Sequence, residues 1–463
     1  MTTAIPRNVH LVGIGGAHMS AIGRILLSWG HNVSGSDLRA TPVTETMEKL
    51  GAKVFIGPHK AENVGDAGLV VTTSAAIGVN PELEEARSRG IPLLKRADMV
   101  ARLMEGKTSI GVAGCHGKST TSGLIATILA AAGRDPTYLI GAEVPGLGTN
   151  AAAGNGEHVV VEADEYDRAF LSYHLDIAIV TNVEADHLDY YGTWEAVQEA
   201  FRQFASQVKP GGTLILCADN AEALSLRGYA APGVTVVTYG LDAGADWKTA
   251  RDITNIPDGQ GFKAYRSGKA FGGFITPLAG RHMVQNALGA IAACACLGLT
   301  PDEIRPAIAA YGGVKRRFER VGEVNAVLVM DDYAHHPTEI AALAQAAKAR
   351  FPGRRIVAMF QPHTYARSRY LLDGFKTCFT GFDRLFILET YAAREAIADG
   401  MTGAQLAAEL HDPEPTYAAT FEEGADVVAA DLRPGDVFFT VGAGDVDAIG
   451  PMVLERLRGR AEA

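Results

Sequence analysis

The residues at 111–121 have the composition of a loop that binds phosphate, and they read GVAGCHGKSTT. In such a loop, glycines let backbone N–H groups converge on an anion, a lysine reaches the terminal phosphates, and a hydroxyl coordinates Mg²⁺. Lys118 and Ser119 supply the lysine and the hydroxyl. The usual motif has a glycine five positions before Gly117, but this chain has Val112 there.

The segments before and after this loop distinguish a phosphate-binding loop from a chance Gly-Lys-Ser turn. The apolar run TSIGVAG before it predicts a buried strand, and STTSGLIATILAAAG after it predicts a helix. A glycine loop between a strand and a helix N-terminus favours an anion, whereas a chance Gly-Lys-Ser turn lacks this context. We therefore predict nucleotide phosphate contacts from Gly114, Cys115, His116, Gly117, Lys118, Ser119 and Thr120.

Two other strand ends offer metal ligands. Glu162 ends the strand in HVVVEADEYD, and His187 follows the strand in DIAIVTNVEADHLDYY. Because ligands gather at the carboxyl ends of parallel strands, we predict that Ser119, Glu162 and His187 hold Mg²⁺ beside ATP. Taken alone, His187 reads as a surface-loop histidine. The neighbouring acids read as solvated charges: Asp164, Glu165 and Asp186.

A later segment, GRHMVQNALGAIAACACLG, predicts a helix with His282 and Asn286 one turn apart on the same face. In a nucleotide-binding domain these two side chains would flank the adenine. The alternative is that both are ordinary polar residues at the start of a helix.

The N-terminal segment VHLVGIGGAHMSAIGRILLSWGHNVSGSD has the order strand, glycine turn, helix, strand and acid. Gly13 and Gly15 fit a dinucleotide fingerprint, and Asp37 falls where an acid that binds ribose is expected. The third glycine position holds His18, which puts the usual close helix–strand contact in question. A structural turn without a ligand and a nicotinamide-dependent oxidoreductase are the alternatives.

Two polar clusters, DDYAHHPTEI and FQPHTYARSR, each follow a strand in the last third of the chain. Because both lie at strand carboxyl ends, we expect them to face one cleft. Arginine binds carboxylates and phosphates through two parallel hydrogen bonds, so an anionic substrate is expected there. The candidate side chains are Asp331, Asp332, His335, His336, His363, Arg367 and Arg369.

Length and charge limit the class of protein. The chain has 463 residues, and a length of this order predicts about two to four domains. Its formal net charge of −11 argues against nucleic-acid binding, which needs clustered cations. The N-terminus lacks the pattern of a signal peptide, and the longest apolar run, 287–299, is too short for a membrane span. The odd number of cysteines, without metal-ligand spacing, fits the cytoplasm.

Three stretches alternate strand and helix signals, and they begin at NVHLVGIGG, TSIGVAGCHGKS and NAVLVMDDYAHHP. This alternation predicts an α/β protein with parallel sheets. We predict a Rossmann-like domain at residues 1–105, a P-loop ATPase-type domain at 106–321 and a second Rossmann-like domain at 322–463.

Together these motifs resemble those of the Mur ligases, in the family's order and over nearly the whole chain. The stretches that carry the resemblance are VGIGGAHMSAIG, GCHGKSTT, VEADEYDRAFL, TNVEADHLDYY, GRHMVQNA, DDYAHHPTE, FQPHTYARSR and VGAGD. DDYAHHPTE followed by FQPHTYARSR looks like the branch that adds alanine, rather than those that add glutamate, diaminopimelate or a dipeptide.

The resemblance implies an activity and its participants. The chain would be an ATP- and Mg²⁺-dependent ligase that joins L-alanine to UDP-N-acetylmuramate through an acyl phosphate, in peptidoglycan synthesis. It would act as a monomer or a homodimer. A non-catalytic regulator that binds a UDP-sugar or ATP is an alternative from another class. A relative that reattaches a recycled tripeptide is a further alternative, against which FQPHTYARSR argues.

The resemblance also implies a role for particular residues. The catalytic residues would be Lys118, His335 and Arg367, with the amino acid near Tyr333, His335 and Arg367. The nucleotide would contact Asp332, His282 and Asn286 besides the phosphate loop. The UDP-sugar would lie against Gly13, Gly15, Gly16, Asp37 and Ser74.

Four positions depart from the family pattern. Cys115 and Ser119 replace threonines, Met283 replaces an asparagine, and His18 replaces a glycine. The hydroxyl, lysine, acid and histidine of the predicted metal site are all kept, so we expect the activity to be kept as well.

Overall fold

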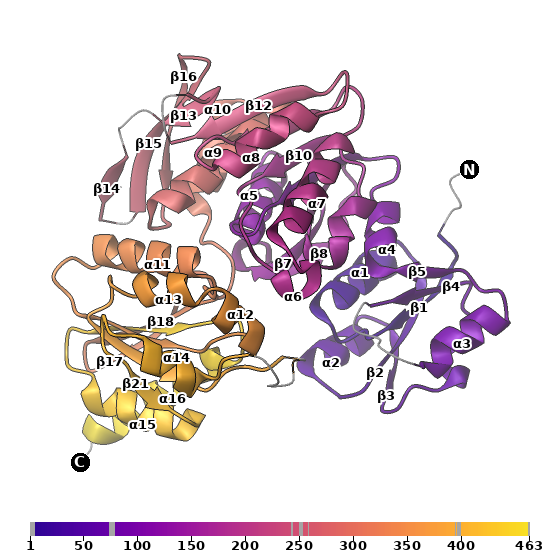
Figure 1. Cartoon of the computed structure of the whole chain (residues 1–463). Coiled ribbons are helices and arrows are strands. Elements are labelled where there is room, and N and C mark those ends of the chain that lie inside the picture. Colours follow the sequence, from indigo (N-terminus) through magenta and orange to yellow (C-terminus); the bar gives the residue numbers. More distant parts are fainter. Residues whose placement is uncertain are drawn as a thin grey trace.

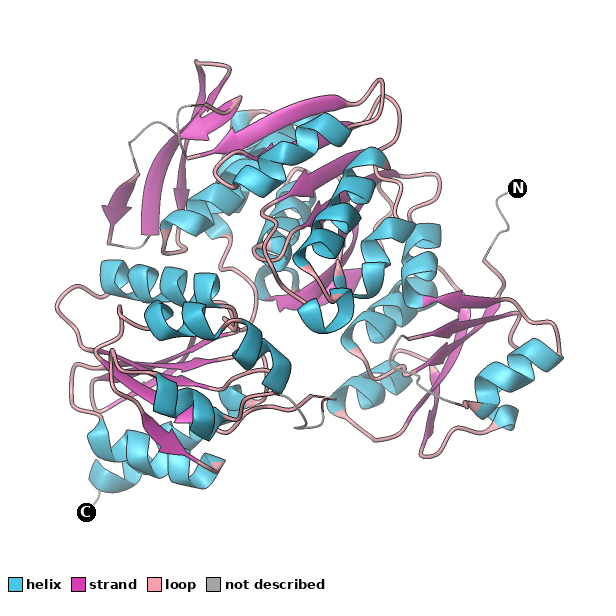
Figure 2. Cartoon of the chain, viewed as in Figure 1, coloured by secondary structure: helices cyan, strands magenta, loops and turns pink. Residues whose placement is uncertain are grey.

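The computed structural model describes residues 5–73, 79–241, 244–249, 253–257, 259–393, 395 and 400–461. The chain forms three α/β domains, each built on a sheet of its own (Figures 1 and 2). The predicted α/β class with three domains is thus confirmed. Among the described residues, no helix combines the length and the apolar character that a membrane span requires.

The first domain has a five-stranded parallel sheet in the order β3-β2-β1-β4-β5. The turn after β1 has Gly13 at φ +79°, a conformation that glycine adopts at little cost. The elements are β1 (Asn8–Val12), α1 (Ala17–Ser28), β2 (Asn32–Asp37), α2 (Pro42–Lys49), β3 (Lys53–Ile56), β4 (Leu69–Thr72), α3 (Pro81–Ser88), β5 (Leu93–Lys95) and α4 (Arg96–Leu103).

The middle domain has an eleven-stranded sheet in the order β14-β15-β13-β12-β11-β10-β6-β9-β7-β8, with β16 beside β15. Strand β6, which leads into the phosphate loop, lies between β10 and β9. The strands are β6 (Thr108–Ala113), β7 (Thr137–Val144), β8 (Thr149–Ala152), β9 (His158–Glu162), β10 (Ile177–Val180), β11 (Thr213–Cys217), β12 (Thr235–Gly240), β13 (Trp247–Thr249), β14 (Thr254–Ile256), β15 (Gly259–Arg266) and β16 (Lys269–Thr276).

Helices cover both faces of the middle sheet. Apolar side chains of α5, α9 and α10 form the core on one face, and those of α7 pack on the other. Helix α1 of the first domain adds Met19, Ile22 and Ile25 to the core on the α7 side, so the first two domains share one core. The helices are α5 (Lys118–Ala131), α6 (Leu188–Tyr191), α7 (Trp194–Ser206), α8 (Ala221–Ser225), α9 (Arg281–Cys296) and α10 (Pro301–Ala310).

The third domain has a six-stranded sheet in the order β17-β18-β22-β19-β20-β21, in which only β17 is antiparallel to its neighbour. The boundary predicted between residues 321 and 322 falls inside β17. The strands are β17 (Glu319–Val324), β18 (Val327–Asp332), β19 (Ile356–Phe360), β20 (Arg384–Leu388), β21 (Thr416–Ala418) and β22 (Val437–Val441). The helices are α11 (Pro337–Arg350), α12 (Tyr365–Tyr370), α13 (Leu372–Cys378), α14 (Gly403–Glu409), α15 (Phe421–Asp431) and α16 (Ile449–Ala461).

The third domain, orange to yellow in Figure 1, lies beside the middle domain, and α11 and α12 are on the side that faces it. Arg367 of α12 is paired with Asp186 of the middle domain at 2.9 Å. The first domain is tied to the middle domain by Arg96 and Asp164 at 3.2 Å. The three domains therefore surround a common central region, into which the phosphate loop opens.

Candidate active site

A central cavity of about 790 Å³ is lined by all three domains. It contains residues of the phosphate loop, of two strand ends of the middle domain and of both polar clusters of the third domain. The expectation that these clusters face one cleft is confirmed. The sequence-predicted residues that line it are Cys115, Gly117, Lys118, Ser119, Glu162, His187, Asp331, Tyr333, His335, His363 and Arg367, and His18 of the first domain lines it as well.

The phosphate loop lies between β6 and α5, as the sequence predicts. Gly114 has φ +129° and Gly117 has φ +80°, so both need glycine. A Cβ on Gly114 would also lie 2.1 Å from Oγ1 of Thr181. Val112 is a buried residue inside β6, before the loop begins. The unusual spacing is therefore explained, because the loop needs its glycines at Gly114 and Gly117 and not at Val112.

Lys118 is the first residue of α5, and its ammonium group is held inside the cavity wall. Its Nζ donates to both carboxylate oxygens of Glu165, at 2.8 and 2.9 Å, and to the carbonyl oxygen of Gly114 at 2.6 Å. Burial opposes the charge, but the carboxylates of Glu165, Glu162 and Asp164 hold the pKa of Lys118 above its ordinary value. Lys118 is thus a fixed cation at the N-terminus of a helix.

The predicted metal ligands lie on the wall next to Lys118. The Ser119 hydroxyl donates to Oε2 of Glu162 at 2.8 Å, and the backbone N–H of Gly141 donates to the same oxygen at 2.9 Å. His187 precedes α6 with φ +53°, and its Nε2 is 3.5 Å from Oε1 of Glu165. A hydroxyl, a carboxylate and an imidazole fit a divalent cation beside phosphates. Burial opposes the charge of His187, but Asp186 and Glu165 raise the pKa of His187, so the cation would have to displace the proton of that ring.

Two of the acids that read as solvated charges are in fact buried. Glu165 is 1% exposed and Asp186 is 4% exposed. Although burial opposes its charge, His187 and Arg367 hold the pKa of Asp186 well below the ordinary value. The solvated interpretation was wrong for these two residues, because each carboxylate is the partner of a buried cation that the sequence alone does not reveal.

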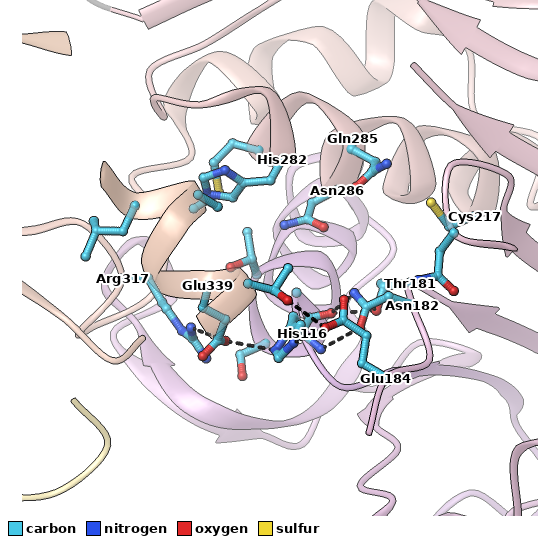
Figure 3. A pocket seen from close by; sticks show the side chains of 18 of the residues that line it. His116, Thr181, Asn182, Glu184, Cys217, His282, Gln285, Asn286, Arg317 and Glu339 are labelled. Atoms are coloured by element: carbon cyan, nitrogen blue, oxygen red, sulfur yellow. Dashed lines mark hydrogen bonds and ion pairs between the residues drawn. The ribbon is translucent and has the colours of Figure 1, made fainter. Parts of the chain in front are cut away.

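A second cavity, of about 240 Å³, adjoins the phosphate loop between the middle and third domains (Figure 3). His282 and Asn286 of α9 both face it, which agrees with the predicted helix face. Burial lowers the pKa of His282 to about 4, so its imidazole is neutral and suits an uncharged ring. The sequence-predicted residues in this cavity are His116, Gly117, Ser119, Thr120, His282, Asn286 and Asp332.

Some of the predicted histidines and arginines of the third domain lie at the central cavity, and one, Arg369, lies away from it. His335 Nδ1 lies 3.0 Å from the carbonyl oxygen of Tyr333, and burial lowers the pKa of His335 to about 3. Nη1 of Arg367 lies 2.9 Å from Nδ1 of His363. Arg369 is exposed and does not line either cavity, although the sequence grouped it with Arg367.

Asp332 ends β18 and has a structural task. Its two oxygens accept the backbone N–H groups of Phe318 and Ala334, each at 2.8 Å. Burial raises its pKa to about 6. Asp332 therefore fixes the chain between the middle and third domains where that chain lines the smaller cavity.

In the first domain, the predicted ligand residues surround the turn after β1. The backbone N–H of Gly15 donates to Oδ2 of Asp37 at 2.9 Å, and Gly16 is the N-cap of α1. Ser74 lies outside the described residues. His18, in place of the third glycine, lines the central cavity, and its buried Nε2 has no hydrogen-bond partner among the described residues.

Several residues of the site were missed by the sequence interpretation. Figure 3 shows three of them, Arg317, Glu339 and Glu184, in a chain of ion pairs with the predicted His116 across the domain boundary. Glu339 lies in the quoted motif DDYAHHPTEI, and Glu184 lies in TNVEADHLDYY. Their presence in these motifs was a signal, but their partners lie far away in the sequence, and for Glu339 in another domain, so the sequence gives no pairing.

Comparisons with known proteins agree with this arrangement. Three family models match consecutive parts of the chain: the Mur ligase family catalytic domain at residues 8–108, the Mur ligase middle domain at 112–294, and the Mur ligase glutamate ligase domain at 316–444. The chain belongs to the Mur ligase family.

Its curated relatives narrow the class further. The chain is 41% identical over 458 residues to the UDP-N-acetylmuramate–L-alanine ligase of Geobacter sp. (strain M21), with 98% of each chain covered. It is 42% identical to the ligase of the same name from Myxococcus xanthus, over 97% of this chain and 95% of that one. The crystal structure of the UDP-N-acetylmuramate–alanine ligase of Thermotoga maritima matches with a TM-score of 0.81 at 28% identity, over 98% of this chain and 99% of that one.

Proposed function

We propose that this chain is an ATP-dependent ligase that joins L-alanine to UDP-N-acetylmuramate, and so serves peptidoglycan synthesis, the cell wall, cell shape and cell division. The observation that carries the proposal is the central cavity, where Lys118 of the phosphate loop faces His335 and Arg367 of the third domain. A carboxylate, a phosphoryl donor and an amine need such a common space. The curated relatives of matching length support the same substrates.

The nucleotide is assigned to the two adjoining cavities. Its adenine would lie in the smaller cavity beside His282 and Asn286, and its phosphates would lie on the loop between Gly114 and Thr120. The N-terminus of α5 and the Lys118 ammonium group favour anions there. Lys118 would exchange its contact with Glu165 for the terminal phosphates.

Mg²⁺ is assigned to Ser119, Glu162 and His187. Their hydroxyl, carboxylate and imidazole donors fit the ion, and the 2.8 Å contact between Ser119 and Glu162 keeps two of these donors adjacent. When bound, Mg²⁺ would offset negative charge on the phosphoryl oxygens. Asp186 and Glu165 keep the surrounding cations in place.

Removing one of these donors should raise the Mg²⁺ requirement. We expect Glu162→Gln and His187→Gln each to raise the Mg²⁺ concentration for half-maximal activity by about tenfold or more. A Mg²⁺ titration of activity measures this. Glu199→Gln, an exposed change of the same kind on α7, is the control and should leave the midpoint unchanged. Unchanged midpoints in both site variants would mean that the metal is held by other residues.

The UDP-sugar is assigned to the first domain. The turn from Gly13 to Gly16 and the N-terminus of α1 suit a diphosphate, and the carboxylate of Asp37, which accepts the backbone N–H of Gly15, suits a ribose. Because α1 packs against the middle sheet, a sugar nucleotide bound there would extend into the central cavity. Ser74 is kept as a contact on the resemblance alone.

The chemistry has two steps. A carboxylate oxygen of the sugar substrate attacks the γ-phosphorus, the bond to the β-phosphate oxygen breaks, and ADP leaves an acyl phosphate. The amine of L-alanine then attacks the acyl carbon, and phosphate leaves from the tetrahedral intermediate. Lys118 stabilises the charge that gathers on the phosphoryl oxygens. Closure of the third domain over the cavity protects the acyl phosphate from water.

The amino acid is assigned to Tyr333, His335 and Arg367. Arg367 would bind the carboxylate of alanine. The attacking amine must lose a proton, and the neutral imidazole of His335 or a nearby acid such as Asp331 is the acceptor. Burial lowers the pKa of His335, so its ring is neutral at neutral pH but a weak base, and bound substrate would have to raise that pKa for His335 to accept the proton.

The assignment is tested by measuring ADP release while each substrate is omitted in turn, over a panel of amino acids. We expect release only with ATP, UDP-N-acetylmuramate and L-alanine together, and slower release with glycine or L-serine. One methyl group supplies only about 1–3 kcal/mol of discrimination, so these small amino acids are not fully excluded. Release with D-glutamate or a tripeptide in place of L-alanine would contradict the assignment, as would reduction of a nicotinamide cofactor.

Two properties of the whole protein follow from the same assignment. Its five cysteines are free, which fits the reducing cytoplasm where we place the enzyme. One chain supplies all three domains around the cavity, so a monomer or a homodimer would carry a complete site.

A further inference from the structure

The carboxylate of Glu339 contacts three parts of the molecule: the phosphate loop, the segment between the middle and third domains, and the turn that carries His335. Its Oε1 lies 3.2 Å from Nδ1 of His116, in the phosphate loop, and 2.9 Å from Nη1 of Arg317, between the domains. Its Oε2 accepts the backbone N–H of His335 at 3.0 Å. The side chain is 7% exposed. One buried group therefore joins the nucleotide side of the site to the amino-acid side.

His116 forms the other half of this contact. Its Nδ1 faces Glu339, and its Nε2 is 3.5 Å from Oε2 of Glu184. Because each ring nitrogen faces a carboxylate oxygen, both nitrogens carry a proton and the ring is an imidazolium. Burial opposes this charge, but Glu339 and Glu184 raise the pKa of His116 to about 10. The contact is electrostatic, since neither nitrogen makes a hydrogen bond of ordinary geometry.

The same geometry argues against a metal ion bound between His116, Glu184 and His336. His116, Glu184 and His336 have potential ligand atoms within 4.8 Å of one another. An imidazolium has no free lone pair, and a metal ion there would have to displace the proton that both carboxylates stabilise. The cluster is thus an ion-pair network that crosses the domain boundary.

We propose that Glu339 is a positioning residue that couples the phosphate loop to the amino-acid site through His116 and the backbone of His335. The inference rests on the proposed function. Nucleotide phosphates fix the loop and with it the imidazolium of His116. Glu339 is held against that imidazolium, so the turn that carries Tyr333 and His335 is held in the geometry that receives L-alanine.

Two other contacts across this boundary lack this link, whereas the ring of His116 also lies 4.8 Å from the ring of His336, the neighbour of His335. Thr338 donates to Oε2 of Glu184 at 2.7 Å, and Arg367 is paired with Asp186. Neither Thr338 nor Asp186 has a described contact with the backbone of His335. The coupling through Glu339 therefore predicts a specific change in the KM for L-alanine rather than a general weakening of the contacts between the domains.

Glu339→Gln tests the proposal in the full chain. The amide oxygen can still accept the N–H of His335, but the charge that faces His116 and Arg317 is lost. We expect the KM for L-alanine to rise about tenfold, within the range of site-to-site coupling, and the KM for UDP-N-acetylmuramate to change less than about twofold. The matched control is Thr338→Val, which removes a boundary hydrogen bond one residue away and should not raise the KM for L-alanine in this way.

A double-mutant cycle with His116→Gln identifies the route of the coupling. If the two side chains act as a pair, His116→Gln should raise the KM for L-alanine in the wild-type background but add little to Glu339→Gln. Additive effects would overturn the proposal, as would an unchanged KM for L-alanine in Glu339→Gln or an equal rise in Thr338→Val.

Two other experimental outcomes must be distinguished from a failure of the proposed coupling. If the wild-type chain does not ligate L-alanine at all, the proposed function fails before the variants are compared. If Glu339→Gln does not fold by circular dichroism, His116→Gln carries the test alone at saturating ATP. A raised KM for L-alanine then supports the coupling, and an unchanged one overturns it.

Discussion

Replacing Lys118 by alanine should reduce turnover by a factor of about 10³ or more, while binding of the UDP-sugar is largely retained. In the proposed mechanism Lys118 supplies the fixed cation for the transferring phosphoryl group, and the loss of one such group typically costs about 10²–10³ in rate before any effect on ATP binding. Steady-state ADP release measures the loss, and calorimetric titration with UDP-N-acetylmuramate measures the binding.

The control for this variant is Lys209→Ala. Lys209 lies in the same domain and is also paired with a carboxylate, that of Asp176 at 2.8 Å, but it does not line the central cavity. It should keep normal turnover. Retained ligase activity in Lys118→Ala would remove Lys118 from its proposed role. Loss of UDP-sugar binding together with activity would indicate misfolding, because Glu165 is left buried without its cation.

Arg367→Ala should reduce kcat/KM for L-alanine by about 10²–10³. Its guanidinium is only 9% exposed and pairs with Asp186 at 2.9 Å, so the change removes both the proposed carboxylate partner of alanine and a contact across the domain boundary. Truncation of one partner of a buried charge pair typically costs about 3–5 kcal/mol. Kinetics at varied L-alanine concentration measure the effect.

Arg369→Ala is the matched control, because Arg369 lies two residues further along α12 and is exposed. It should change kcat/KM less than about twofold, as surface substitutions usually have little effect. Equal losses of kcat/KM in both variants would mean that substitutions anywhere on α12 lower the activity. Normal alanine kinetics in Arg367→Ala would exclude Arg367 from the amino-acid site.

Local patterns predicted the positions of many residues of the proposed nucleotide site. A strand, a glycine loop and a helix in sequence fix where Lys118 and Ser119 lie, and helical periodicity fixes that His282 and Asn286 share a face. Strand ends also placed Glu162 and His187 on the central cavity, because the carboxyl ends of parallel strands gather at one edge. These features depend on neighbouring residues alone.

The pairing of charges could not be predicted in the same way. After β9 the chain turns irregularly, with Asp167 at φ +55° and Arg168 at φ +53°, so strand alternation does not show which acid faces Lys118. The structure shows that Glu165 does. The contacts of Glu339 and Asp186 join separate domains, and a single sequence contains no register between domains.

His18 illustrates the limit of a motif. The fingerprint predicts a glycine at this position for close packing, yet the chain packs α1 through Met19, Ile22 and Ile25 and turns the imidazole toward the central cavity. The helix keeps its place because its apolar side chains, rather than the third glycine, form the core it shares with the middle domain.

The most direct test of the account follows the oxygen atoms of the substrate. UDP-N-acetylmuramate with both carboxylate oxygens labelled as ¹⁸O is converted with ATP, Mg²⁺ and L-alanine, and both products are analysed by mass spectrometry. Transfer through an acyl phosphate predicts one ¹⁸O in the released phosphate and one in the new amide of a product that carries a single alanine. Unlabelled phosphate, or a product without an alanine amide, would contradict the account.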